Sequence, residues 1–250
     1  MWLLSPATIH LNGTPTMQRS SFYGRLLMSC IALMVCFGLP QPWSRLASLG
    51  YLVLGVVLIQ GLGRDTLNAA HQGRLSRAYQ MLGVAAIAFW LFWILTPLQM
   101  RNTGVPVILL WTLFGGWSAV RLIRRLAREH QVNSGVLQGA VAGYLMLGLA
   151  SGLLLSGLET IHPDSFRGVD IGHQSGDAAP SVWGLNFAQL NYFAFVSLTT
   201  MGYGDVIPLT PAASMICVMV AITGTFYIAS VMGVLISRLT VQEAEHARRS

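Results

Sequence analysis

Long apolar runs recur along this chain and are separated only by short polar segments. A run of roughly 17 to 25 apolar residues is the length that spans a lipid bilayer as a helix. Charged residues make up only 10% of the sequence, whereas soluble domains contain about 25%. The pattern therefore predicts an all-α membrane protein with six transmembrane helices. These helices are expected at about residues 22–39, 46–62, 79–98, 104–122, 136–157 and 211–237.

The arginines indicate how these helices are oriented. All fifteen residues of the Lys+Arg total are arginine. If the N-terminus is inside, twelve of them fall in the cytoplasm and only Arg45, Arg101 and Arg167 face out. Under the positive-inside rule this predicts that both termini are cytoplasmic, and we expect a multi-pass protein of the plasma membrane. The net charge of +6 is thus a topology signal, and no nucleic-acid partner is expected because no clustered basic patch interleaved with aromatic residues is present.

The first apolar run has a second possible meaning. It follows Arg19 and Arg25 and ends at Pro40, a pattern that a secretory signal peptide shares. A small-residue cleavage site is not evident after the run. We therefore expect a retained helix, and cleavage would leave the orientation of the later helices as before.

A short apolar run between the fifth and sixth expected helices breaks the pattern. Residues 158–185 before it are polar and rich in glycine and proline. The run itself, residues 186–198, is too short to cross a bilayer as a helix. It is therefore expected to be a re-entrant helix, with Asn186 as a candidate N-cap. The chain leaves it through the sequence TTMGYGD, residues 199–205, which we call the TTMGYGD segment.

Either the TTMGYGD segment is an ordinary turn, or its backbone is the working surface. Unpaired backbone groups at membrane depth are tolerated only when protein buries them or when they line a watery cavity. A dehydrated cation is one partner that could satisfy a row of carbonyls. Consecutive carbonyls face one axis only if alternate residues take left-handed dihedrals, which glycine adopts at little steric cost. Gly202 and Gly204 have the spacing that this arrangement requires.

The TTMGYGD segment resembles the selectivity filter of potassium channels, whose usual form is TVGYGD. The resemblance extends over about residues 186–238, through Pro208 and a long final helix. It is the pattern of a prokaryotic potassium channel subunit with six spans and a single pore loop. In that family, rings of backbone carbonyls replace the water around a potassium ion. The resemblance implies ion binding at Thr200, Met201, Gly202, Tyr203 and Gly204, and support of the filter by Thr199, Asp205, Tyr192 and Phe193.

The resemblance also implies partners. One chain carries one filter segment, so a closed ring around an ion needs several copies, and the family points to a homotetramer surrounded by membrane lipids. Potassium is the permeant ion at the filter carbonyls; no cofactor, no transition-metal site and no enzymatic activity are expected. Gly224 lies 20 residues after Gly204, where many bacterial potassium channels carry a gating hinge. Close helix packing explains a glycine there equally well.

The same resemblance divides the chain into parts. The first four helices look like a voltage-sensor scaffold without sensing charges, because residues 104–120 carry none and steep gating needs about 3–4 charges per subunit. Arg121, Arg124, Arg125 and Arg128 follow instead, as a topological anchor that also links to the pore. The expected parts are a cytoplasmic tail (1–21), the scaffold (22–130), a pore module of span five, pore helix, filter and span six (131–240), and a short cytoplasmic tail (241–250).

Acidic residues gather on the expected outer side. They would concentrate cations near an entrance, although a solvated loop accounts for the first four equally well. Asp205 is expected to hydrogen-bond behind the filter. The acids are Glu159, Asp164, Asp170, Asp177 and Asp205, opposed only by Arg167.

Three alternatives to a potassium channel can be weighed, and the first two remain open. Met201 replaces the usual valine, isoleucine or leucine, which leaves a weakly selective cation channel as one alternative. A regulatory pore subunit that needs a partner chain is another. An intramembrane enzyme is the third, and the spans contain no aspartate pair, His-Glu motif or serine/lysine dyad to support it.

Overall fold

The structure, a computed structural model, is built almost entirely of helices. It describes residues 15–39, 46–63, 70–95, 101–129, 132–169 and 187–249. Eight α-helices, one π-helical turn and two short strands make up this part of the chain. They are α1 (Pro15–Phe37), α2 (Leu46–Leu62), α3 (Ala70–Leu95), α4 (Arg101–Arg128), α5 (Ser134–Ile161), β1 (Phe166–Arg167), α6 (Phe187–Leu198), β2 (Ile207–Pro208), α7 (Pro211–Tyr227), η3 (Ile228–Met232) and α8 (Gly233–Arg249).

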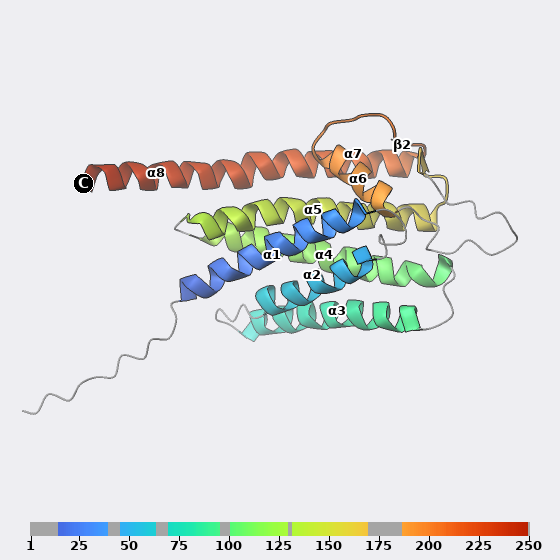
Figure 1. Ribbon diagram of the computed structural model, residues 1–250, viewed down its shortest axis with the longest axis horizontal. Coiled ribbons are helices and arrows are strands. Elements are labelled where there is room, and N and C mark those ends of the chain that lie inside the picture. The colour runs from blue at the N-terminus through green and yellow to red at the C-terminus, as the bar shows by residue number, and fades with distance from the viewer. Residues whose placement is uncertain are drawn as a thin grey trace, which may run out of the picture.

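The helices lie side by side as a bundle (Figure 1). In this view α3 lies at one edge, and α1, α2, α4 and α5 form the middle. At the opposite edge, α7, η3 and α8 run on as one long helix. The short helix α6 lies between α5 and α7 and packs against both. This arrangement places α6 and the TTMGYGD segment beside the last long helix.

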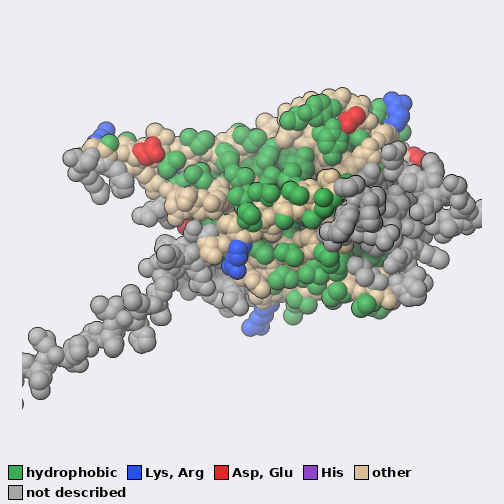
Figure 2. Space-filling model, in the orientation of Figure 1, with side chains coloured by type: hydrophobic (Ala, Val, Ile, Leu, Met, Phe, Trp, Pro, Cys, Tyr) green, Lys and Arg blue, Asp and Glu red, His purple; other side chains and the backbone are tan. Residues whose placement is uncertain are grey.

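Among the described residues, four helices are long and apolar enough to cross a membrane, judged by length and composition. They are found within α3, α4, α5 and the continuous α7–α8 helix, at Arg74–Trp93, Gly104–Arg128, Ser134–Ile161 and Pro211–Glu245. The apolar parts of α1 and α2, Ser21–Phe37 and Ala47–Leu62, are shorter. Figure 2 shows hydrophobic side chains over much of the visible face and only a few charged side chains. The chain is therefore a helical membrane protein.

Several helices extend beyond the apolar runs that predicted them. α1 begins at Pro15, within the expected tail of residues 1–21, and α3 begins at Ala70 rather than at 79. α8 continues to Arg249 through the expected tail of residues 241–250. The apolar pattern marks only the membrane-length part of a helix. Flanking Gln, Arg, Glu and Ala residues have good helix propensity and continue it into the polar region.

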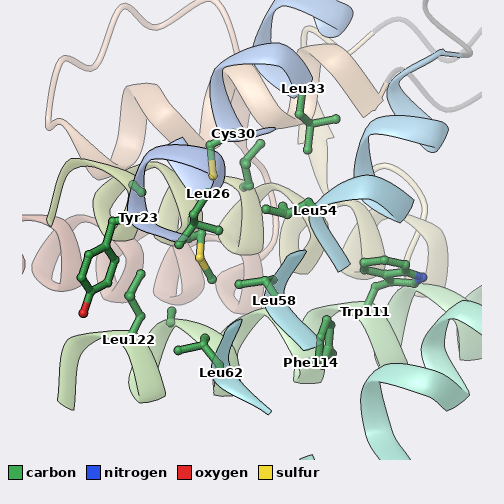
Figure 3. Close-up of a cluster of buried hydrophobic side chains, with 14 of the residues drawn as sticks. Tyr23, Leu26, Cys30, Leu33, Leu54, Leu58, Leu62, Trp111, Phe114 and Leu122 are labelled. Carbon is green, nitrogen blue, oxygen red and sulfur yellow. The ribbon is translucent and has the colours of Figure 1, made fainter. Parts of the chain in front are cut away.

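The core of the first four helices is apolar and closely packed. Figure 3 shows side chains from α1, α2 and α4 meeting between these helices. Gly61 of α2 permits a close approach, since a β-carbon built there would lie 1.7 Å from the ring of Phe22. Completely buried members include Leu26, Cys30, Leu33, Leu62, Phe114 and Leu122.

Two arginines at the end of α4 point into this core. The Arg121 guanidinium lies 4.5 Å from the centroid of the Tyr79 ring. Arg125 lies 5.3 Å from the ring centroid of Phe22 and donates a hydrogen bond to the carbonyl of Gly61 at 3.0 Å. Cations over aromatic faces are attracted by the ring quadrupole. These contacts tie α4 to α1, α2 and α3, as a structural anchor does.

Candidate ion-conduction site

Helix α6 ends in a Schellman motif that leads the chain into the TTMGYGD segment. The amide of Met201 donates to the carbonyl of Val196 at 3.0 Å, and the amide of Thr200 donates to the carbonyl of Ser197 at 3.1 Å. Thr200 has a φ of 58°, the left-handed conformation that this motif requires after the last helical residue. Threonine rarely adopts it, and strain of this kind is concentrated at functional sites.

Left-handed backbone alternates along the TTMGYGD segment. The φ angles of Thr200, Gly202 and Gly204 are 58°, 63° and 81°, whereas φ is not positive at Met201 and Tyr203 between them. Gly202 and Gly204 thus have the dihedrals that their spacing predicts. Among the described residues, no hydrogen bond is donated to the carbonyls from Thr200 to Gly204. Within the described part of the chain, these backbone oxygens therefore have no hydrogen-bond donor.

The two neighbouring aromatic residues of α6, Tyr192 and Phe193, make different contacts. The ring of Tyr203 stacks on that of Tyr192, with centroids 6.5 Å apart and 4° between the planes. The carboxylate of Asp205 accepts a hydrogen bond from the Tyr192 hydroxyl, which raises the pKa of that phenol. Phe193 is buried and packs against Phe166 of β1, with centroids 5.6 Å apart. Tyr192 thus contacts the TTMGYGD segment, while Phe193 supports β1 instead.

The start of the TTMGYGD segment is held by α5 and α7. The Tyr144 hydroxyl of α5 donates to the carbonyl of Leu198 at 3.4 Å. Gly224 of α7 lies against the same carbonyl, which leaves no room for a larger residue. The Thr199 hydroxyl turns back to its own helix and donates to the carbonyl of Phe195 at 2.7 Å. The beginning of the segment is therefore fixed by three helices.

The long helix after the TTMGYGD segment is irregular beyond Gly224. Gly224 is itself buried in regular α-helix. The π-helical turn η3 begins four residues later, and the amide of Gly233 closes it on the carbonyls of Ile228 and Ser230. Such turns are rare and often lie at functional sites. The contact of Gly224 with α6 favours the packing explanation of this glycine over the hinge explanation.

A two-stranded antiparallel sheet lies beside the end of the TTMGYGD segment. Strands β1 and β2 pair antiparallel, with Phe166 opposite Pro208. Gly168 follows β1 with a φ of 87°, and a β-carbon there would lie 2.1 Å from the carbonyl oxygen of Asp205. The side-chain amide of Gln189 in α6 donates to the carbonyl of Gly168. Sequence reasoning missed Gly168, because a lone glycine in a polar loop carries no motif.

The sequence analysis placed Glu159 among the acids of the outer side. In the structure its side chain is buried, so it does not contribute an exposed charge there. Its carboxylate accepts hydrogen bonds from the amides of Asp164, Ser165 and Phe166 at 2.9, 3.0 and 3.2 Å. The three amides fold the turn after α5 around this side chain. Of the other expected acids, Asp164 and Asp205 are exposed, and Asp170 and Asp177 lie outside the described residues.

The comparison with known families agrees with this geometry. Residues 171–241 match a protein-family model described as "Ion channel". The matched residues include α6, the TTMGYGD segment, α7 and η3. The chain therefore contains an ion-channel domain within a helical membrane protein. No match was found among curated proteins.

Proposed function

We propose that this chain is the subunit of a potassium-selective channel that conducts K⁺ passively through a tetrameric pore in the plasma membrane. The observation that carries the proposal is the alternation of positive φ at Thr200, Gly202 and Gly204 beside carbonyls with no described hydrogen-bond donor. Carbonyls of this kind replace the hydration shell of K⁺ in channel filters. The ion-channel match of residues 171–241 supports the general class.

Ions would move along these carbonyls without any cofactor. K⁺ sheds water at the oxygens of residues 200–204, and neighbouring ions drive one another onward by repulsion. The Thr200 hydroxyl completes the innermost site. Asp205 keeps the outer end negative, which raises the local cation concentration.

Large apolar side chains that are exposed on the single chain support a tetramer. Tyr203 and Met201 are 66% and 60% exposed, and Phe226 of α7 is 72% exposed. Apolar surface of this kind needs cover by lipid or by another protein surface. One segment also cannot surround an ion by itself, whereas a closed ring of four copies supplies both the axis and the cover.

Helices α1 and α2 would complete six spans. The 23 residues of α1 extend about 34 Å at 1.5 Å per residue, and the 17 residues of α2 extend about 26 Å. Both lie within the range found for membrane helices. Residues 22–130 then form a scaffold around the pore module of residues 131–240, and both termini lie in the cytoplasm as the arginines indicate.

Recordings from purified protein in planar bilayers test the proposal. With K⁺ on one side and Na⁺ on the other, the current should reverse close to the K⁺ equilibrium potential. Reversal near zero would indicate the weakly selective channel that Met201 leaves open. If this chain alone carries no current and a partner chain restores the current, the chain is a regulatory subunit. Native mass spectrometry of the same sample tests whether the channel contains four copies of the chain.

A further inference from the structure

Asn191 is a buried amide in the middle of α6. Its side chain is 2% exposed, in a helix that is otherwise mostly apolar. A buried amide is costly unless it is hydrogen-bonded. Amides between membrane helices usually hydrogen-bond across to a neighbouring helix. The partners of Asn191 therefore indicate what holds α6 in place.

Two other helices surround the Asn191 side chain. Its Oδ1 accepts a hydrogen bond from the Tyr51 hydroxyl of α2 at 3.3 Å. Its Nδ2 donates to the carbonyl of Phe187 at 2.9 Å within α6. On α5, a β-carbon built on Gly152 would lie 2.1 Å from Asn191 Oδ1. Asn191 thus fits into a notch in α5 and is tied to α2.

Tyr51 is itself fixed by two further helices. Its ring lies 6.0 Å from that of Phe37 in α1 and 5.9 Å from that of Trp111 in α4, both edge to face. Edge-to-face pairs at this separation are favourable and directional. The hydroxyl that reaches Asn191 is therefore positioned jointly by α1, α2 and α4.

Asn191 directly precedes Tyr192, whose ring stacks on Tyr203. Successive residues of an α-helix project about 100° apart around the axis. Fixing the direction of Asn191 therefore fixes the rotation of α6 and the direction of Tyr192. A rotated α6 would move the Tyr192 ring away from Tyr203 and shift the start of the TTMGYGD segment.

We propose that Tyr51 and Asn191 are positioning residues for ion selectivity. The hydrogen bond between them sets the rotation of α6, so the geometry of the TTMGYGD segment depends on the first four helices. This inference rests on the proposed channel function. It gives the N-terminal helices a role in selectivity that needs no charge movement within α4.

Two substitutions test the pair. Tyr51→Phe removes only the hydroxyl and keeps the ring between Phe37 and Trp111. Asn191→Leu replaces the amide with an apolar side chain of similar size. From bi-ionic reversal potentials, each should lower the K⁺/Na⁺ permeability ratio by about threefold, which is the factor in an equilibrium constant that corresponds to the stability from one hydrogen bond between membrane helices. The double variant should fall no further than Asn191→Leu alone, because the two groups act through one bond.

Tyr79→Phe is the matched control. The Tyr79 hydroxyl pairs with the hydroxyl of Ser118 at 2.8 Å inside the scaffold, so this change also removes a buried hydroxyl. It should leave the permeability ratio unchanged. A wild-type ratio in Tyr51→Phe would overturn the inference, and so would an equal fall in Tyr79→Phe, which would indicate general loosening. If Asn191→Leu does not assemble, Tyr51→Phe against Tyr79→Phe decides.

The two proposals fail in different ways. A wild-type chain that conducts without K⁺ selectivity would refute the proposed function, and this inference with it. A selective wild-type chain whose Tyr51→Phe and Asn191→Leu variants keep the same ratio would refute this inference alone.

Discussion

Gly224 of α7 lies in direct contact with the carbonyl oxygen of Leu198: a β-carbon built on this glycine would stand 2.1 Å from that oxygen. The Tyr144 hydroxyl donates to the same oxygen from α5. The last carbonyl of α6 is therefore held from two sides immediately before the TTMGYGD segment. A displacement of α7 at this point would therefore reach the start of the candidate filter through the contact between Gly224 and Leu198.

This contact predicts the effect of Gly224→Ala. The added methyl group meets backbone rather than a flexible side chain, and overpacking typically costs about 1–3 kcal/mol. The variant should melt at lower temperature and conduct less K⁺. Gly233→Ala is the control, because nothing lies within 4 Å of the position of its β-carbon. Equal thermal stability of both variants and the wild type would contradict the packing role of Gly224.

The Tyr192–Tyr203 stack predicts a graded loss of selectivity. Tyr192→Phe keeps the ring but removes the hydroxyl that donates to Asp205. Tyr192→Leu removes the stack as well, and an aromatic pair is worth about 0.5–1.5 kcal/mol beyond burial. In bi-ionic recordings, the K⁺/Na⁺ permeability ratio should be highest in the wild type, lower in Tyr192→Phe and lowest in Tyr192→Leu. The opposite order, or no change in Leu, would show that the stack does not position the segment.

Glu159→Gln should destabilise the turn after α5 and the start of β1. The substitution removes a charge that three amides share and places an NH₂ group among donors. A hydrogen bond to a charged group is worth about 1.5–3 kcal/mol. The expected result is a lower unfolding temperature and faster proteolysis between α5 and α6. Asp164→Asn, at an exposed carboxylate in the same turn, should leave both measurements near wild type.

Arg125→Gln should weaken the fold without changing any response to voltage. The substitution removes the hydrogen bond to Gly61 and the contacts with the rings of Phe22 and Tyr23. The free energy of unfolding should fall by about 1.5–3 kcal/mol, the contribution of a hydrogen bond to a charged group. Thermal unfolding measures this fall. Arg124→Gln, at an exposed arginine of the same helix, is the control. A shallower conductance–voltage curve in Arg125→Gln alone would indicate a sensing role instead.

The sequence predicted the elements that have a short-range signal. The short run before TTMGYGD was expected to be a helix over 186–198, and α6 covers Phe187–Leu198. The glycine spacing predicted left-handed backbone at Gly202 and Gly204. Thr200, which also has positive φ, was not foreseen, because its conformation follows from the helix-ending motif rather than from its residue type.

Features that depend on distant parts of the chain could not be read from local pattern. The burial of Glu159 depends on a turn that folds back over its carboxylate, so its acidic character alone suggested an exposed position. Phe193 and Tyr192 are equivalent in the sequence, and only the packing of α6 against β1 separates their roles. The tie between Tyr51 and Asn191 joins residues 140 positions apart, and no spacing rule connects them.

Potassium flux into liposomes tests the central claim, that the backbone of the TTMGYGD segment is the conduction path. Gly202→Ser places a side chain where φ is 63°, a conformation that costs L-residues roughly 1–2 kcal/mol. The wild-type chain should carry K⁺ down its gradient, and assembled Gly202→Ser protein should lose that flux or its preference for K⁺ over Na⁺. Equal, equally selective flux from both proteins would contradict the account.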